Sequence, residues 1–109
     1  MIYLCREHEL STDCPVRVEV DGTAYAVFAL RDGVYVTQDE CTHGPGSLSE
    51  GAVERDEVIC PFHMGRFDIR TGAPTGPPCT IALRTWRATV EEGAVWIDPR
   101  ETARTSRDR

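Results

Sequence analysis

Apolar and polar residues alternate along much of the chain. The stretch VRVEV, from Val16 to Val20, places a charged residue after each of its first two valines, which is the pattern of a strand with one buried face. The DG that follows predicts a tight hairpin turn. TAYAVFAL and VYVTQD, which are separated by RDG, read as two more strands. The first half of the chain is therefore predicted to form an antiparallel meander.

The second half continues the β pattern around a proline-rich interruption. Residues 66–72, RFDIRTG, read as a short strand that ends in a turn. Residues 72–79, GAPTGPPC, hold three prolines and two glycines, so we expect a stiff loop there and neither a helix nor a central strand. Imperfect alternation over 81–90, and AVWID after a turn at EEG, predict two closing strands. Since no segment shows a convincing helical period, we expect an all-β fold.

Length, composition and charge narrow the class of protein. The chain has 109 residues, 40% of them hydrophobic, and a net charge of −6. This fits one domain and argues against nucleic-acid binding, which needs a basic patch. We expect one domain over 1–98 and a flexible polar tail over 99–109. No apolar run approaches the roughly 20 residues of a membrane span, and we find no export signal. We therefore expect a cytoplasmic protein without membrane contact, whose five cysteines form no disulfide framework.

Two pairs of cysteine and histidine stand out as metal ligands. Cys41 and His43 are followed, after sixteen residues, by Cys60 and His63. Both pairs lie in glycine- and proline-containing segments between predicted strands, as metal-binding loops often do. A structural zinc site is one interpretation, although zinc modules usually group the two cysteines and the two histidines separately. The alternation of Cys and His favours a two-iron cluster, in which each loop gives its cysteine to one iron and its histidine to the other.

The motif resembles that of the Rieske ferredoxins, which is C-x-H, a gap of about sixteen or seventeen residues, and C-x₂-H. The likeness extends to GPGSLSEG after the first pair, to GRFD and TG after the second, and to the proline loop. It implies stacked antiparallel sheets, with one [2Fe-2S] cluster held by loops of about residues 40–79 at the tip. It also implies that Cys41 and Cys60 bind the inner iron, and that His43 and His63 bind the outer iron.

Departures from the respiratory Rieske proteins bear on the reduction potential. Those proteins have an extra cysteine in each loop, joined as a disulfide, and a serine and a tyrosine that donate hydrogen bonds to cluster sulfur. The resemblance places Gly46, Phe62, Gly65 and Phe67 at these positions. Because hydrogen bonds to the sulfurs raise the potential, we expect one at the low end of the Rieske range of roughly −150 to +300 mV.

The resemblance implies an electron carrier and no enzyme. Low-potential Rieske ferredoxins pass single electrons from a flavin-containing reductase to a terminal oxygenase that acts on aromatic compounds, and we expect these partners, a monomeric state and no substrate pocket. The small Rieske subunit of another redox complex, such as nitrite reductase, is an alternative, and a structural zinc-binding interaction module is another. The acidic body suits partners with basic docking faces. The candidates for docking are four charged residues beside the cluster loops: Glu40, Glu50, Glu54 and Arg66.

Three cysteines and one histidine fall outside the motif. We expect Cys5, Cys14 and Cys79 to be free thiols, with Cys79 alone placed to protect the cluster because it ends the proline loop. His8 is expected at the surface.

Overall fold

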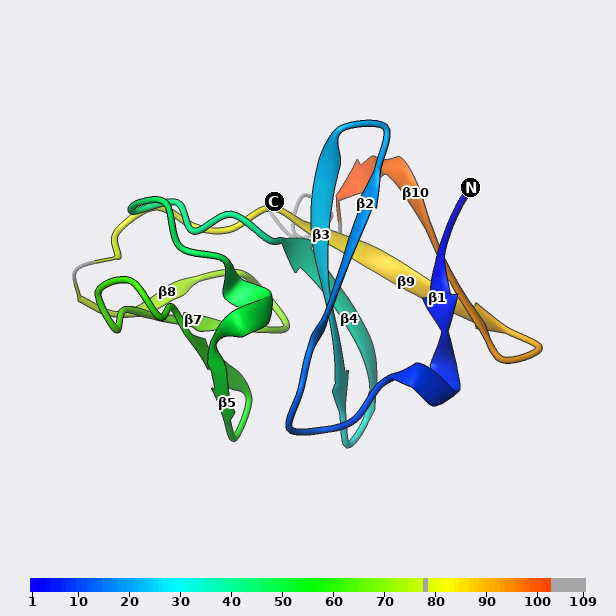
Figure 1. The fold of residues 1–109 in the computed structure, drawn as a ribbon, viewed down its shortest axis with the longest axis horizontal. Helices are drawn as coiled ribbons and strands as arrows, with labels where there is room; N and C mark the ends of the chain where they lie inside the picture. Colours follow the sequence, from blue (N-terminus) through cyan, green and yellow to red (C-terminus); the bar gives the residue numbers. More distant parts are fainter. Residues whose placement is uncertain (78, 103–109) are drawn as a thin grey trace.

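The chain forms two antiparallel sheets. The structure, a computed structural model, describes residues 1–77 and 79–102. Among these, a six-stranded sheet has the order β1-β10-β9-β4-β3-β2, and a four-stranded sheet has the order β5-β6-β7-β8 (Figure 1). The elements are β1 Ile2–Arg6, η1 Glu7–Glu9, β2 Val16–Val20, β3 Thr23–Leu30, β4 Gly33–Gln38, η2 Leu48–Glu50, β5 Ala52–Glu54, β6 Glu57–Ile59, β7 Arg66–Asp68, β8 Pro74–Gly76, β9 Thr85–Glu91 and β10 Ala94–Thr102. The predicted all-β fold of stacked antiparallel sheets is confirmed.

Strand β3 is buried on both faces, which explains its nearly continuous apolar sequence. Tyr25 and Val27 belong to a cluster formed within the large sheet. Ala26 and Phe28 point the other way, into a second cluster that contains residues of both sheets. Successive side chains of a strand point to opposite faces, so this one strand contributes to both cores.

Two hairpin turns match the predicted turn chemistry. Asp21 and Gly22 have φ values of 51° and 82°, and Glu92 and Gly93 have values of 52° and 79°. Positive φ at both central residues is the mark of the type I′ turn, whose twist suits a tight hairpin. The DG and EG pairs therefore fix the registers of β2 with β3 and of β9 with β10.

The sequence did not predict four of the strands, which are β1, β5, β6 and β8. β1 pairs with β10 at one edge of the large sheet, yet it lies before the region where alternation is visible. β8, which includes Pro74, lies in the segment predicted to be a loop, and for residues 74–76 that prediction was wrong. The strand is at the edge of the small sheet, where the missing proline N–H costs no ladder hydrogen bond.

The predicted bounds of the last strands were also wrong. β9 begins at Thr85, and Ile81 lies outside it with a side chain that is 63% exposed. β10 extends to Thr102, which is beyond the expected end of the domain at residue 98. The rest of the predicted tail, residues 103–109, lies outside the described residues. No helix in the described part of the chain is long and apolar enough to span a membrane.

Arg70 ties the small sheet to the large one. Its guanidinium pairs with Asp32, in the turn between β3 and β4, at 2.9 Å, and with Asp56, in the turn between β5 and β6, at 2.7 Å. It also lies over the Tyr35 ring, 5.4 Å from the centroid. The hydrogen bond from Arg70 holds the pKa of Asp32 below its usual range. This bridge helps to fix the small sheet, from which one ligand loop projects.

Candidate metal centre

Three loops meet at one end of the molecule, at the left in Figure 1. The first ligand loop joins β4 to η2, the second ligand loop joins β6 to β7, and a third loop leads from β8 to β9. β4 of the large sheet and β6 of the small sheet thus bring the predicted ligands from separate parts of the sequence to the same place.

Local hydrogen bonds close the first ligand loop. The Cys41 amide donates to the Gly46 carbonyl at 2.9 Å. The His43 amide donates to the Cys41 sulfur at 3.4 Å. The Thr42 hydroxyl donates to the Ile81 carbonyl at 2.6 Å, so the first ligand loop is also fastened to the third loop.

The second ligand loop is a compact turn. The Cys60 amide donates to the Gly65 carbonyl at 2.8 Å, and the Met64 amide donates to the Cys60 carbonyl at 2.9 Å. Met64 has a φ of 62°, a left-handed conformation that costs a side-chain-bearing residue about 1–2 kcal/mol. The loop holds this conformation just after His63, where it redirects the chain into β7.

The two ligand loops pack in direct contact at Gly46. A Cβ atom on this residue would lie 2.6 Å from the Cys60 sulfur and 3.0 Å from the Phe62 Cβ. Both distances are shorter than ordinary van der Waals contact, so only glycine fits here without movement. The glycine therefore allows the first ligand loop to lie against the second ligand cysteine.

The four predicted ligands form a buried pair and an exposed pair. Cys41 and Cys60 are 4% and 2% exposed, respectively. His43 and His63 are exposed, and their ring centroids are 5.0 Å apart in an edge-to-face arrangement. Two inner thiols below two outer imidazoles match the arrangement expected for a Rieske cluster.

A third thiol lies beside the two predicted cysteine ligands. Burial raises the pKa of Cys79 to about 11, with a further contribution from the Cys41 thiol, and burial also raises the pKa of Cys60. Cys41, Cys60 and Cys79 belong to the same buried cluster. Cluster iron takes thiolates, so loading a cluster onto the two predicted cysteine ligands would release protons. The sequence signal for Cys79 was only its position at the end of the proline loop.

The donor set fits a two-iron cluster better than a zinc ion. The Cys41 and Cys60 thiols interact with each other, and the centroids of the His43 and His63 rings lie 5.0 Å apart. Structural zinc takes four ligands around one point, whereas each iron of a Rieske cluster takes two protein ligands and completes its shell with sulfide. Two separate pairs of side chains are what the cluster needs.

Two of the four docking candidates lie on the small sheet, and the other two lie beside the first ligand loop. Arg66 on β7 pairs with Glu54 on β5 at 2.8 Å and with Glu57 on β6 at 3.1 Å, and these hydrogen bonds raise the pKa of Arg66. Glu40 and Glu50 are exposed at the two ends of the segment that contains the first ligand loop.

Sequence reasoning missed three exposed apolar side chains in the second ligand loop and the third loop. Phe62, Met64 and Ile81 are 49%, 65% and 63% exposed, respectively. Phe62 and Met64 flank His63 in sequence, with the Phe62 ring 4.2 Å from the His63 ring. The position of Phe62 and Met64 beside a ligand was visible in the sequence, but their exposure was not.

His8 lies at the surface, as predicted, and the cysteines outside the motif lie in different surroundings. All five cysteines are free of disulfides, Cys5 and Cys79 are buried, and Cys14 is exposed. His8 is exposed in η1, and Cys5 lies in β1 within the core of the large sheet.

Comparisons with known proteins agree with this geometry. The Rieske [2Fe-2S] domain matches residues 1–87. Ferredoxin CarAc of Metapseudomonas resinovorans is 40% identical over 95 residues, which cover 86% of this chain and 89% of the relative. The ferredoxin component of the p-cumate 2,3-dioxygenase system of Pseudomonas putida is 39% identical over 100 residues, which cover 90% and 85%, respectively.

Solved structures give the same result. A complex of oxygenase and ferredoxin from carbazole 1,9a-dioxygenase contains a chain that is 38% identical, with a TM-score of 0.83 over 89% of this chain and 100% of that one. A nitrite reductase small subunit is more distant, at 27% identity and a TM-score of 0.78 over 89% and 96%. The chain belongs to the Rieske [2Fe-2S] domain family and carries a cluster of that type.

Proposed function

We propose that this chain is a one-electron carrier that takes electrons from a flavin-containing reductase and passes them to a terminal oxygenase acting on aromatic compounds. The observation that carries the proposal is the pair of exposed imidazoles above a pair of buried thiols, at the tip where the ligand loops meet. When bound, the cluster supplies a centre that gains and loses one electron. The relatives named as ferredoxin components of dioxygenase systems support this role.

In this proposal the four side chains have distinct positions relative to the cluster. Cys41 and Cys60 hold the inner iron from within the core. His43 and His63 hold the outer iron and present their ring edges to solvent, because both are exposed. The short path from these rings to the surface gives a partner access to the electron without opening the fold.

Three residues in or just after the second ligand loop support a low reduction potential. Phe67 is fully buried beside the cysteines in the shared core and carries no hydroxyl group. Gly65 and Phe62 likewise offer no side-chain hydroxyl or thiol. Hydrogen bonds to cluster or ligand sulfur raise the potential by stabilising the reduced state. A chain without hydroxyl groups at these positions should hold its electron less tightly than a respiratory Rieske protein does.

We assign partner docking to two kinds of surface. Phe62 and Met64 flank His63 in sequence, and the Ile81 carbonyl accepts a hydrogen bond from Thr42, next to His43. We call these three exposed apolar residues and the two histidines the apical collar, and propose that it supplies an apolar contact at the point of electron transfer. Exposed apolar groups that gather in this way are a mark of interaction sites, and electron-transfer contacts are small.

Charged residues around the apical collar complete the docking proposal. Glu40 and Glu50 supply negative charge beside the first ligand loop. Arg66 pairs with both Glu54 and Glu57, so this group of three side chains carries a net negative charge. Long-range attraction to a basic partner raises the rate of encounter more than the final affinity.

The free cysteines suit a carrier in a reducing compartment, and two clefts do not involve the proposed ligands. Two open clefts of about 420 and 560 Å³ are lined by residues other than the four proposed ligands. The five cysteines are free of disulfides, as suits the cytoplasm. We propose that the protein works there as a monomer.

The test uses the holoprotein with purified partners. The chain should contain iron and sulfide, be reduced by a flavin-containing reductase of an aromatic dioxygenase system, and support product formation only when both reductase and oxygenase are present. Zinc in place of iron would overturn the metal assignment. Efficient electron delivery to a nitrite reductase catalytic subunit, with none to the oxygenase, would overturn the proposed partner.

A further inference from the structure

Asp39 is a buried acidic side chain two residues before the first proposed ligand. It is 3% exposed and directly follows the end of β4. The other buried polar residues of the described chain, Thr37 and Thr85, carry no charge. A buried carboxylate is costly unless its charge and lone pairs are satisfied. The partners of Asp39 therefore indicate which parts of the chain it joins.

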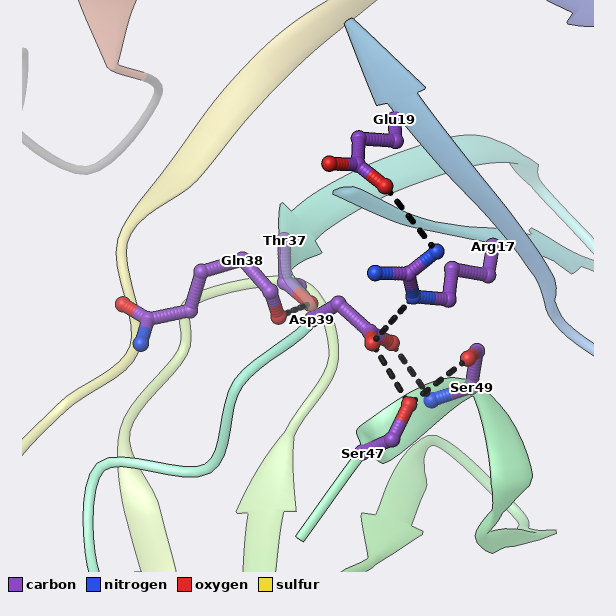
Figure 2. Close-up of polar contacts among 7 residues, drawn as sticks. All are labelled: Arg17, Glu19, Thr37, Gln38, Asp39, Ser47 and Ser49. Carbon is purple, nitrogen blue, oxygen red and sulfur yellow. Dashed lines mark hydrogen bonds and ion pairs between the residues drawn. The ribbon is translucent and has the colours of Figure 1, made fainter. Parts of the chain in front are cut away.

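Both carboxylate oxygens of Asp39 have partners from other segments, as Figure 2 shows. The Ser47 hydroxyl donates to Oδ2 at 2.5 Å, and the Ser49 amide donates to Oδ1 at 2.8 Å. Nε of Arg17, on β2, lies 3.3 Å from Oδ2. The two serines follow the first ligand loop, whereas Arg17 belongs to the large sheet. One carboxylate thus connects both ends of the first ligand loop to the scaffold.

The backbone forms a second layer of the same connection. The Leu48 amide donates to the Asp39 carbonyl at 2.7 Å, and the Asp39 amide donates to the Ala24 carbonyl of β3 at 3.0 Å. Glu40 and Ser47 form an isolated antiparallel bridge. The neck of the first ligand loop, residues 39–40 and 47–49, is therefore held by its backbone as well as by the carboxylate.

Gly46 leaves little freedom for this neck to shift. It lies directly before Ser47, and its α-carbon faces the Cys60 sulfur so closely that a Cβ would meet that atom at 2.6 Å. A displacement of Ser47 is passed through one peptide unit to the contact between the ligand loops. The position of the neck therefore determines where Cys41 and His43 lie relative to Cys60.

We propose that Asp39 is a positioning residue for the cluster, and that Arg17 and Asp39 together tune its reduction potential. Through Ser47 and Ser49 the carboxylate fixes the neck of the first ligand loop. Through Arg17, which also pairs with Glu19, its negative charge is partly compensated. This inference rests on the proposed function, because it concerns the same centre.

Charge gives the two partners opposite effects on the potential. Asp39 is 4% exposed in its side chain, so water screens it poorly from its surroundings. Replacing it with Asn removes a negative charge, which makes the added electron more stable and raises the potential. Replacing Arg17 with Gln leaves the carboxylate uncompensated and lowers the potential. The double variant should return toward the wild-type value.

Positioning is tested separately by a variant that changes no charge. Ser47→Ala removes the hydroxyl donor to Asp39 and leaves the amide of Ser49 in place. It should broaden the EPR spectrum of the reduced protein and speed the loss of iron to a chelator several-fold. Asp13→Asn, at an exposed position, changes the net charge by the same amount as Asp39→Asn and should alter neither potential nor spectrum.

The experiment measures the potential by protein-film voltammetry, the EPR spectrum, and the urea midpoint of the holoprotein for each variant. Opposite shifts for Asp39→Asn and Arg17→Gln, with spectral broadening in Ser47→Ala, are expected. Lower urea midpoints with unchanged potentials and spectra would overturn the inference and leave Asp39 a purely structural residue. If Asp39→Asn binds no cluster, the potential of Arg17→Gln and the EPR spectrum of Ser47→Ala decide between the two outcomes. A wild-type protein without iron would contradict the proposed function instead, so the two failures are distinguishable.

Discussion

Replacing Gly46 with Ala should separate the two ligand loops and weaken cluster binding. The added Cβ would lie 2.6 Å from the Cys60 sulfur and 3.0 Å from the Phe62 Cβ. Non-bonded carbon contacts are most favourable at about 3.5–4.0 Å, so the loops must move apart by roughly 1 Å. Overpacking of this kind costs about 1–3 kcal/mol. Because the Cys60 sulfur is itself a proposed ligand, the displacement should also reduce the iron content of the protein.

The matched control for this variant is Gly22→Ala. Gly22 has a φ of 82° with nothing within 4 Å of an added Cβ, so its replacement costs about 1–2 kcal/mol through backbone strain alone. Urea unfolding and iron per chain are measured for both variants. Both should lose stability, but only Gly46→Ala should lose iron. Full iron content and an unchanged EPR spectrum in Gly46→Ala would refute the close packing of the ligand loops.

Three further predictions concern docking, the free thiols and acid stability. Ile81→Ser should slow electron transfer to the oxygenase several-fold at every salt concentration and leave the reduction potential unchanged, whereas Glu50→Gln should slow the transfer only at low salt, where charge steering is strong. Stopped-flow mixing of reduced carrier with oxygenase measures both rates. The same salt dependence for both variants would contradict separate apolar and charged docking surfaces. In the metal-free protein at pH 8, iodoacetamide should modify exposed Cys14 well before Cys79, because a thiol with a pKa of about 11 is only about one part in a thousand thiolate at that pH. Peptide mapping by mass spectrometry measures the order of labelling. Early labelling of Cys79 would contradict its burial. Arg70→Met should lower the urea midpoint. Because Arg70 holds the pKa of Asp32 low, the loss of stability relative to wild type should be complete above the unfolded-state pKa of Asp32, near 4, and should shrink as the pH falls through its folded-state pKa. A loss that grows on acidification would contradict the ion pair between Arg70 and Asp32.

Regular alternation and turn chemistry made the central meander predictable, and packing explains where prediction failed. Residues 16–39 carry an alternating strand followed by Asp-Gly, whose positive φ values are the ones the hairpin needs. β1 pairs with β10, the last strand of the described residues, so no local pattern announces it. β8 contradicts the propensity of Pro74, because an edge position removes the usual cost of proline in a sheet.

The proposed ligand pairs follow from sequence spacing, whereas their surroundings depend on tertiary structure. Cys41, His43, Cys60 and His63 stand in two short motifs, so their convergence requires only that β4, β6 and β7 lead to one end of the fold. The exposure of Ile81 arises because β9 begins later than its alternation suggested. The proximity of Cys79 to the ligand cysteines likewise depends on how the third loop folds back.

The hydrogen-bonded network around Asp39 was not predictable from the local sequence either. Its partners are Arg17, Ser47 and Ser49, which lie on both sides of it in the sequence and in no recognisable motif. An acidic residue before a loop ordinarily reads as solvated. Only the burial of the carboxylate and its contacts identify it as a connection between the large sheet and the first ligand loop.

The most direct test of the central claim is electron–nuclear double resonance on the reduced protein, combined with iron and zinc analysis. We predict a two-iron cluster with nitrogen couplings from two imidazoles, one of which disappears in His43→Cys or His63→Cys if the cluster is retained. A protein that contains zinc and no iron, or an iron cluster without nitrogen coupling, would contradict the assignment of Cys41, His43, Cys60 and His63 as its ligands.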